Sequence, residues 1–245
     1  MNYILLIFLF LFFPPSKSTV VKEKIKTLKY TSWTSLRISD ASGITKAGNH
    51  FYIVNDKGGL YETDGMGKII RYKAMGWDNE DICFANGKLY VVDESGRRIL
   101  EVDTQTLKTV AEHVLQYAGA RNLGLESLAY VADKHEFVAI SEKQPSVMFI
   151  LDEKFNVVNQ FKINGFDDIS GATFYNHKLY ILSDEDHVVI KVNPDNLTPD
   201  DFTWEEKWNV PIYNPEGICF DEDGTMRIVS DQCRRIYVFP NPDQQ

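Results

Sequence analysis

The sequence lacks the marks of several common protein classes. Only three of its 245 residues are cysteine, and none has the CxxC spacing, which excludes a disulfide framework and a zinc motif. The chain contains no P-loop, dinucleotide-binding glycine pattern, nucleophile elbow or Ser-His-Asp order. Cys83 and Cys219 each lie in an Ile-Cys-Phe stretch, which favours buried apolar positions for both. The sequence leaves open whether Cys219 and Cys233 form a disulfide or stay free thiols.

Positive charge is also scarce. The chain has 26 Lys and Arg residues against 35 Asp and Glu residues, and its formal net charge is −9. Nucleic acids and anionic lipid surfaces repel such a chain, so we expect no nucleic acid partner and no lipid binding through charge. The same balance is compatible with a cation as the ligand.

The apolar run at the N-terminus is too short to span a membrane. Tyr3 to Phe13 is eleven residues long, whereas a hydrocarbon core about 30 Å thick needs about twenty helical residues. Two prolines and small residues follow, as at a cleavage site, so we predict that residues 1–18 are a signal peptide and that the protein is periplasmic or secreted. Because no Lys or Arg precedes the run, an uncleaved membrane tether formed by the same residues stays open as the alternative.

One pattern occurs five times along the chain. It consists of a short strand, a tight polar turn, a second strand and an acidic residue at its end, and residues 168–184 show it in full. The first strand of each copy begins at an anchor residue, and successive anchors lie 38, 46, 44 and 46 residues apart. The anchors are Ser42, Glu80, Glu126, Ser170 and Glu216. A period of about 40 to 45 residues with strands in each unit is typical of β-propeller blades.

The length of the chain fits five blades. The anchors span 216 − 42 = 174 residues over four intervals, a mean of 43.5, so five blades need roughly 218 residues and six roughly 261. We therefore predict an all-β protein, with five blades of four antiparallel strands over residues 25–240. The last blade has room for three strands only, so residues 25–38 should supply its outer strand and close the ring. The repeat also predicts a strand, not a helix, over residues 106–117.

Two sets of polar residues should meet on one face of the propeller. We name the strands of a blade A to D from the axis outward. Because A and B are antiparallel neighbours, the start of A and the end of B share a face. The anchors form the first ring, at the start of A. The second ring, at the end of B, is acidic in every blade: Asp56, Glu94, Glu142, Asp184 and Asp231.

The first ring favours a cation. The carboxylates of Glu80, Glu126 and Glu216 should converge on the axis, where like charges repel one another. Oxygen ligands without a His or Cys cluster suit calcium, so we predict a calcium ion at the channel mouth. A water-filled polar channel is the alternative for this ring. For the second ring, the simpler interpretation is that the acids cap turns.

A few basic side chains surround the acids. Arg97, His187 and Arg234 lie in loops between strands B and C on the acidic face, where they could bind an anion or pair with the acids of their own turns. His187, or a spare carboxylate such as Glu142, is the candidate base of an enzyme.

The blade motifs resemble a known family. Ser42-Gly43-Ile44, Asp168-Ile169-Ser170-Gly171, Gly124-Leu125-Glu126, Leu182-Ser183-Asp184 and Pro215-Glu216-Gly217-Ile218 resemble the repeats of the SdiA-regulated (YjiK-like) family. That resemblance implies an exported or membrane-tethered five-bladed propeller, distantly related to NHL repeats, with a calcium site. It implies metal ligands among Glu80, Glu126 and Glu216, with Asp168 and Asn55 as further candidates. The chain departs from the Glu-Gly pair of the repeats at Asp81 and Ser127.

These observations favour a calcium-binding propeller whose acidic face binds a small molecule or a protein. The alternative is a calcium-dependent hydrolase, such as a lactonase, phosphoesterase or esterase, with its site at the channel mouth. Fold alone does not decide between them.

Overall fold

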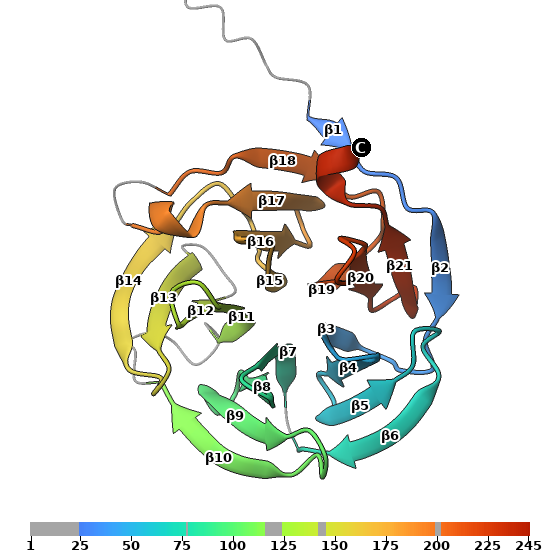
Figure 1. Ribbon diagram of the computed structural model, residues 1–245, viewed down its shortest axis with the longest axis vertical. Coiled ribbons are helices and arrows are strands. Elements are labelled where there is room, and N and C mark those ends of the chain that lie inside the picture. Colours follow the sequence, from blue (N-terminus) through green and yellow to red (C-terminus); the bar gives the residue numbers. More distant parts are fainter. Residues whose placement is uncertain (1–24, 77, 116–123, 142–145, 199–201) are drawn as a thin grey trace, which may run out of the picture.

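The computed structural model describes residues 25–76, 78–115, 124–141, 146–198 and 202–245. Five sheets stand around a central axis like the blades of a propeller (Figure 1). The predicted fold class is therefore confirmed. The predicted signal peptide or tether, residues 1–18, lies outside the described residues. No helix among the described residues is long and apolar enough to cross a membrane.

Each blade has four antiparallel strands, which in the first three blades follow one another outward from the axis in chain order. In the last two blades the outermost strand of the sheet comes from the N-terminal segment. We number the blades one to five and give the strands of each in the order A to D. Blade one consists of β3 (Ala41–Ala47), β4 (His50–Asn55), β5 (Gly59–Thr63) and β6 (Ile69–Ala74), blade two of β7 (Asn79–Ala85), β8 (Lys88–Asp93), β9 (Arg98–Asp103) and β10 (Thr109–Val114), and blade three of β11 (Leu125–Val131), β12 (Glu136–Ser141), β13 (Ser146–Asp152) and β14 (Val157–Ile163). Blade four consists of β15 (Gly171–Tyr175), β16 (Lys178–Ser183), β17 (Val188–Val192) and β18 (Glu206–Asn209), and blade five of β19 (Pro215–Phe220), β20 (Met226–Ser230), β21 (Arg235–Phe239) and β2 (Ser32–Ser35). Two short 3₁₀ helices, η1 (Pro194–Asn196) and η2 (Pro242–Gln244), complete the described elements.

The position of a strand in its blade explains its composition. The B strands are covered by a neighbouring blade on both faces, so β8 is buried at every residue after Lys88. The outer strand β10 is alternately half-buried and exposed along most of its length. It covers residues 109–114 of the stretch 106–117, so a strand forms there as predicted, over fewer residues than expected.

The hydrophobic core consists of clusters between adjacent blades. Ile140 and Met148 of blade three, for example, pack in one cluster with Ile181 and Ile190 of blade four. Cys83 and Cys219 are buried as predicted, and all three cysteines are free thiols. Because each blade is covered by its two neighbours, an open ring would leave one face of each end blade uncovered.

The N-terminal segment closes the ring, but it joins two blades. β2 pairs antiparallel with β21, with Trp33 opposite Tyr237, and so forms the predicted outer strand of the last blade. β1 (Lys26–Thr27) instead pairs parallel with β18 of blade four, with Lys26 opposite Trp208. Figure 1 shows β1 at the edge of β18 and β2 outside β21. The expectation that all of residues 25–38 belong to the last blade is therefore wrong for residues 26–27.

Candidate functional site

The two predicted rings lie on the same face. Asn79 at the start of β7 pairs with Asp93 at the end of β8, and Ala41 pairs with Asn55 in the same way. Pairing in blades three and five follows the same arrangement. We call this face of the propeller, where the A strands begin, the acidic mouth.

A β-bulge at the start of strand A sets the direction of the anchor residue. The pairing register shifts across Ser42, Glu80, Glu126 and Glu216, so each of these residues has no direct partner on strand B. Bulges redirect a side chain, and they are frequent beside functional sites. The three glutamates are half-buried at the mouth.

The two serine anchors have a structural role. The Ser42 hydroxyl donates to the carbonyl of Asn79 in the next blade at 2.6 Å. Ser170 donates in the same way to the carbonyl of Pro215 at 2.9 Å. These serines therefore connect blade one with blade two and blade four with blade five. The acidic anchors lie in blades two, three and five.

The turns after strand B are capped mainly by the residue before the second ring. Asp93 accepts from the backbone N–H of Gly96 at 3.0 Å and from Arg98 Nε at 2.6 Å. The Asn55 side chain accepts from Gly59 N–H at 2.7 Å and donates to the Ser39 carbonyl at 2.9 Å. Because the oxygen and the nitrogen of this amide are both hydrogen-bonded to backbone groups, we leave Asn55 out of the ligand set proposed below.

Three carboxylates come together in blade two. Asp78, Glu80 and Glu94 each offer an oxygen, and these oxygens lie within 4.8 Å of one another. All three side chains are half-buried. From the sequence, Glu80 was predicted as a metal ligand and Glu94 as a member of the second ring, whereas Asp78 was not among the predicted ligands. The signal for the cluster was present, since Asp78 precedes an anchor and Glu94 ends strand B.

A glycine makes room for one of these carboxylates. A Cβ at Gly124 would overlap Cγ and Oε1 of Glu94, so the Glu94 side chain lies directly against the backbone of blade three. The corresponding residues of the other blades are Asp40, Asp78, Asp168 and Asn214. The small residue in blade three thus allows Glu94 to extend along the mouth.

Burial and mutual repulsion raise the pKa values of carboxyl groups at the acidic mouth. Burial raises the pKa of Glu80 to about 9, helped by repulsion from Asp56, Glu94 and Asp78. Burial also raises the pKa of Glu216 to about 8, with repulsion from Asp184 and Asp168. Burial raises the pKa of Asp184 as well. At pKa values of about 9 and about 8, Glu80 and Glu216 are protonated near neutral pH, and a cation bound beside them would displace these protons.

The other candidate residues surround this cluster. Glu126 lies at its bulge in the first ring, and Asp168 acts on Glu216 by repulsion. Arg97, His187 and Arg234 all have left-handed backbone conformations, with φ between 48° and 51°, just before strand C. His187 is exposed, and its charge acts on Asp184. Glu142 lies outside the described residues.

The position of Glu94 against Gly124 can be tested by adding a side chain at Gly124. If the predicted calcium ion binds at the mouth, Gly124→Ala should displace the Glu94 carboxylate and weaken calcium binding about tenfold, which corresponds to about 1.4 kcal/mol. Titration of the metal-free protein with calcium in a calorimeter measures the affinity. Gly65→Ala is the matched control, because a Cβ there meets only Phe51, at 3.9 Å. Equal affinities for the two variants would show that Glu94 is not a ligand.

Comparison with known proteins agrees with this architecture. The family model described as SdiA-regulated matches residues 26–240. A comparison with curated proteins gives no significant match.

Solved structures with the same fold include enzymes. A glutaminyl cyclase from Myxococcus xanthus is 13% identical with a TM-score of 0.71, over 89% of this chain and 97% of that one. A hydrazine synthase from Kuenenia stuttgartiensis is 12% identical with a TM-score of 0.55, over 82% and 83%. The Cps50 (Swd1) propeller domain from Myceliophteria thermophila is 10% identical with a TM-score of 0.55, over 86% and 99%. At these identities the likeness is one of fold.

Proposed function

Because this chain belongs to the SdiA-regulated family of five-bladed β-propellers, we propose that it binds calcium at the acidic mouth and uses that face as a binding platform. This proposal rests on the cluster of Asp78, Glu80 and Glu94, whose oxygens lie within 4.8 Å of one another. Glu126 and Glu216 add carboxylates from two further blades, and Asp168 lies beside Glu216.

The donor set fits calcium. Calcium takes about 6 to 8 oxygen ligands in flexible geometry, and carboxylates from several strands can supply them. A divalent cation also relieves the repulsion that raises the pKa of Glu80 and Glu216. Because all three side chains are partly exposed, an ion that they held would be accessible to a further ligand.

The platform has a hollow beside the cluster. Asp56, Lys57, Gly76, Asp78 and Ser95 line an open hollow of about 560 Å³ between blades one and two. A small molecule or a protein side chain in this hollow would contact Asp78, one of the three clustered carboxylates. We assign Arg97, His187 and Arg234 to the rim that would contact an anionic part of that ligand. From residues 1–18 we propose that the protein acts outside the cytoplasm, either released or tethered to the membrane.

Calcium should stabilise the folded protein strongly. A ligand of the folded state alone, at a hundredfold excess over its Kd, adds about 2.7 kcal/mol. For a domain of this size the melting temperature should rise by roughly 5 to 10 °C. Thermal unfolding of EDTA-treated protein with and without calcium measures the shift, with metal analysis of the purified protein alongside. A protein that carries no calcium and melts at the same temperature in EDTA and in calcium would contradict the site.

The hydrolase alternative has one described candidate base. His187 stands exposed on the rim, and its contact with Asp184 is electrostatic. We therefore propose a binding module as the function. A screen of lactones and phosphoesters with and without chelator distinguishes the two, since only an enzyme gives chelator-sensitive turnover.

A further inference from the structure

The A strands of neighbouring blades approach one another closely just below the acidic mouth, and we call this level the neck. The residue after each anchor lines this neck, and these residues are Gly43, Asp81, Ser127, Gly171 and Gly217. The strands approach so closely that a Cβ on Gly43 would lie 2.6 Å from the Asp81 Cα. A Cβ on Gly217 would lie 2.6 Å from the backbone nitrogen of Ile44. Three of the five blades therefore require glycine at the neck.

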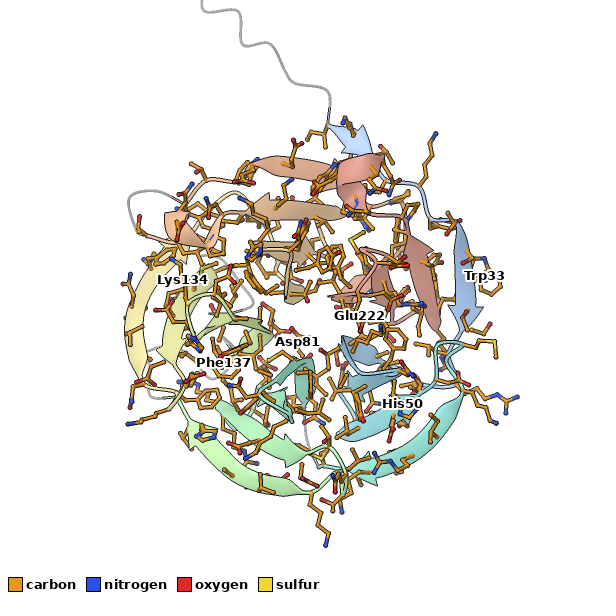
Figure 2. The ribbon with its side chains drawn as sticks, in the orientation of Figure 1. Trp33, His50, Asp81, Lys134, Phe137 and Glu222 are labelled. Carbon is orange, nitrogen blue, oxygen red and sulfur yellow. The ribbon has the colours of Figure 1, made fainter. Side chains whose placement is uncertain are left out.

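Asp81 fills the neck. Its side chain lies near the axis of the ring (Figure 2) and is 1% exposed. Oδ1 accepts from the backbone N–H of Ile82 and Oδ2 from that of Leu128, both at 2.8 Å. Burial raises the pKa of this carboxyl group, and the backbone N–H groups of Leu128, Ile82 and Ala172 counteract that shift. Donors from blades two, three and four thus converge on one carboxylate.

A cavity opens on the other side of the neck. It has a volume of about 120 Å³ and is lined by the middle parts of the A strands, including Ile82 and Ala172 next to the Asp81 carboxylate. Small side chains keep it open at one level of the ring: Thr45, Cys83, Ala129, Thr173 and Cys219. A water molecule needs about 10 to 15 Å³ by this measure, so a small solute fits in the cavity.

We propose that the neck is a carboxylate-binding site made of backbone N–H groups, and that Asp81 occupies it as a tethered ligand. Converging backbone N–H groups bind anions in many folds, and here they come from three separate strands. The tethered carboxylate closes the axis, so the acidic mouth and the cavity are separate compartments. A ligand bound on the acidic face therefore has no passage along the axis into the cavity. This inference is independent of the calcium site.

Removing the tethered ligand should create a site for a free one. Asp81→Gly gives blade two the glycine of blades one, four and five and leaves the three N–H groups without their acceptor. We expect its melting temperature to fall by about 5 °C or more. Sodium formate should then raise it again in a saturable manner, entering through the cavity. The measurement is thermal unfolding in EDTA over a series of formate concentrations, with sodium gluconate, too large for the neck, matching the ionic strength.

Two controls sharpen the result. Wild-type protein, whose neck is full, should show no difference between formate and gluconate. Asp81→Asn keeps the volume but replaces one acceptor oxygen by a donor, so it should be destabilised without rescue by formate.

An Asp81→Gly protein as stable as the wild type, or one that formate and gluconate affect equally, would overturn the proposal. If this variant does not fold without formate, Asp81→Ser, which places the residue of blade three at the neck, is measured in the same way. Failure of both variants to fold in formate would also overturn it, because a free carboxylate should replace the tethered one.

Discussion

A chain that begins at Ser39 should lose its cooperative unfolding transition. Residues 32–35 form the outer strand of the last blade, and their removal leaves β21 as an open edge. Leu36 and Ile38 pack in the cluster that joins blades five and one, with Val229 and Ile236. Leu28 packs with Trp208 at the other end of the segment. The deletion therefore opens the ring and uncovers two blade interfaces.

The expected loss approaches the whole stability of a domain. Burying one large aliphatic side chain contributes about 1.5 to 3 kcal/mol, so these three contribute roughly 5 to 9 kcal/mol. Domains are stable by about 5 to 15 kcal/mol in total. Circular dichroism during heating measures the result. A chain that begins at Ile25 is the control and should melt like the full-length protein, whereas an unchanged melting curve for the chain from Ser39 would refute closure by this segment.

The five blades could be predicted because each one repeats the same register of apolar and acidic residues. The path of the closing segment could not. Lys26 and Thr27 are exposed and form a two-residue parallel strand, which leaves no pattern of alternation in the sequence. Their place depends on contacts far along the chain, such as the bond from Lys29 N–H to Gln245 Oε1 at 2.7 Å.

The candidate site was predictable to the level of the rings. Aligning the repeats places Glu80, Glu126 and Glu216 at one face, because the alternation of strands fixes which end of each strand they occupy. The convergence of particular carboxylates depends on the bulges and on the space above Gly124, which no repeat count reveals. The roles of Ser42 and Ser170 as ties between blades, and of Asn55 as a turn cap, were likewise decided by backbone contacts.

Without metal, the protein should become less stable as the pH rises from about 5 to 9. Below its ordinary pKa of 4.5, Glu80 is protonated in both the folded and the unfolded chain. Between 4.5 and about 9 the unfolded chain releases this proton while the folded chain keeps it, so the folded state loses stability as the pH rises through this range. Glu216 adds the same dependence up to about pH 8. Urea unfolding in EDTA across this range measures the slope.

Glu80→Gln should reverse its effect on stability when calcium is added. In EDTA at pH 8 to 9 the variant lacks the carboxyl group that resists ionisation, so it should be more stable than the wild type by on the order of 1 to 3 kcal/mol. In saturating calcium it lacks a ligand, so the wild type should be the more stable protein. The comparison at each pH cancels the titration of groups elsewhere, and Glu206→Gln, an exposed glutamate on β18, controls for the loss of one negative charge. A variant that is less stable than the wild type under both conditions would mean that Glu80 stabilises the mouth through contacts other than a cation, and the ligand set proposed above would then be wrong at its central residue.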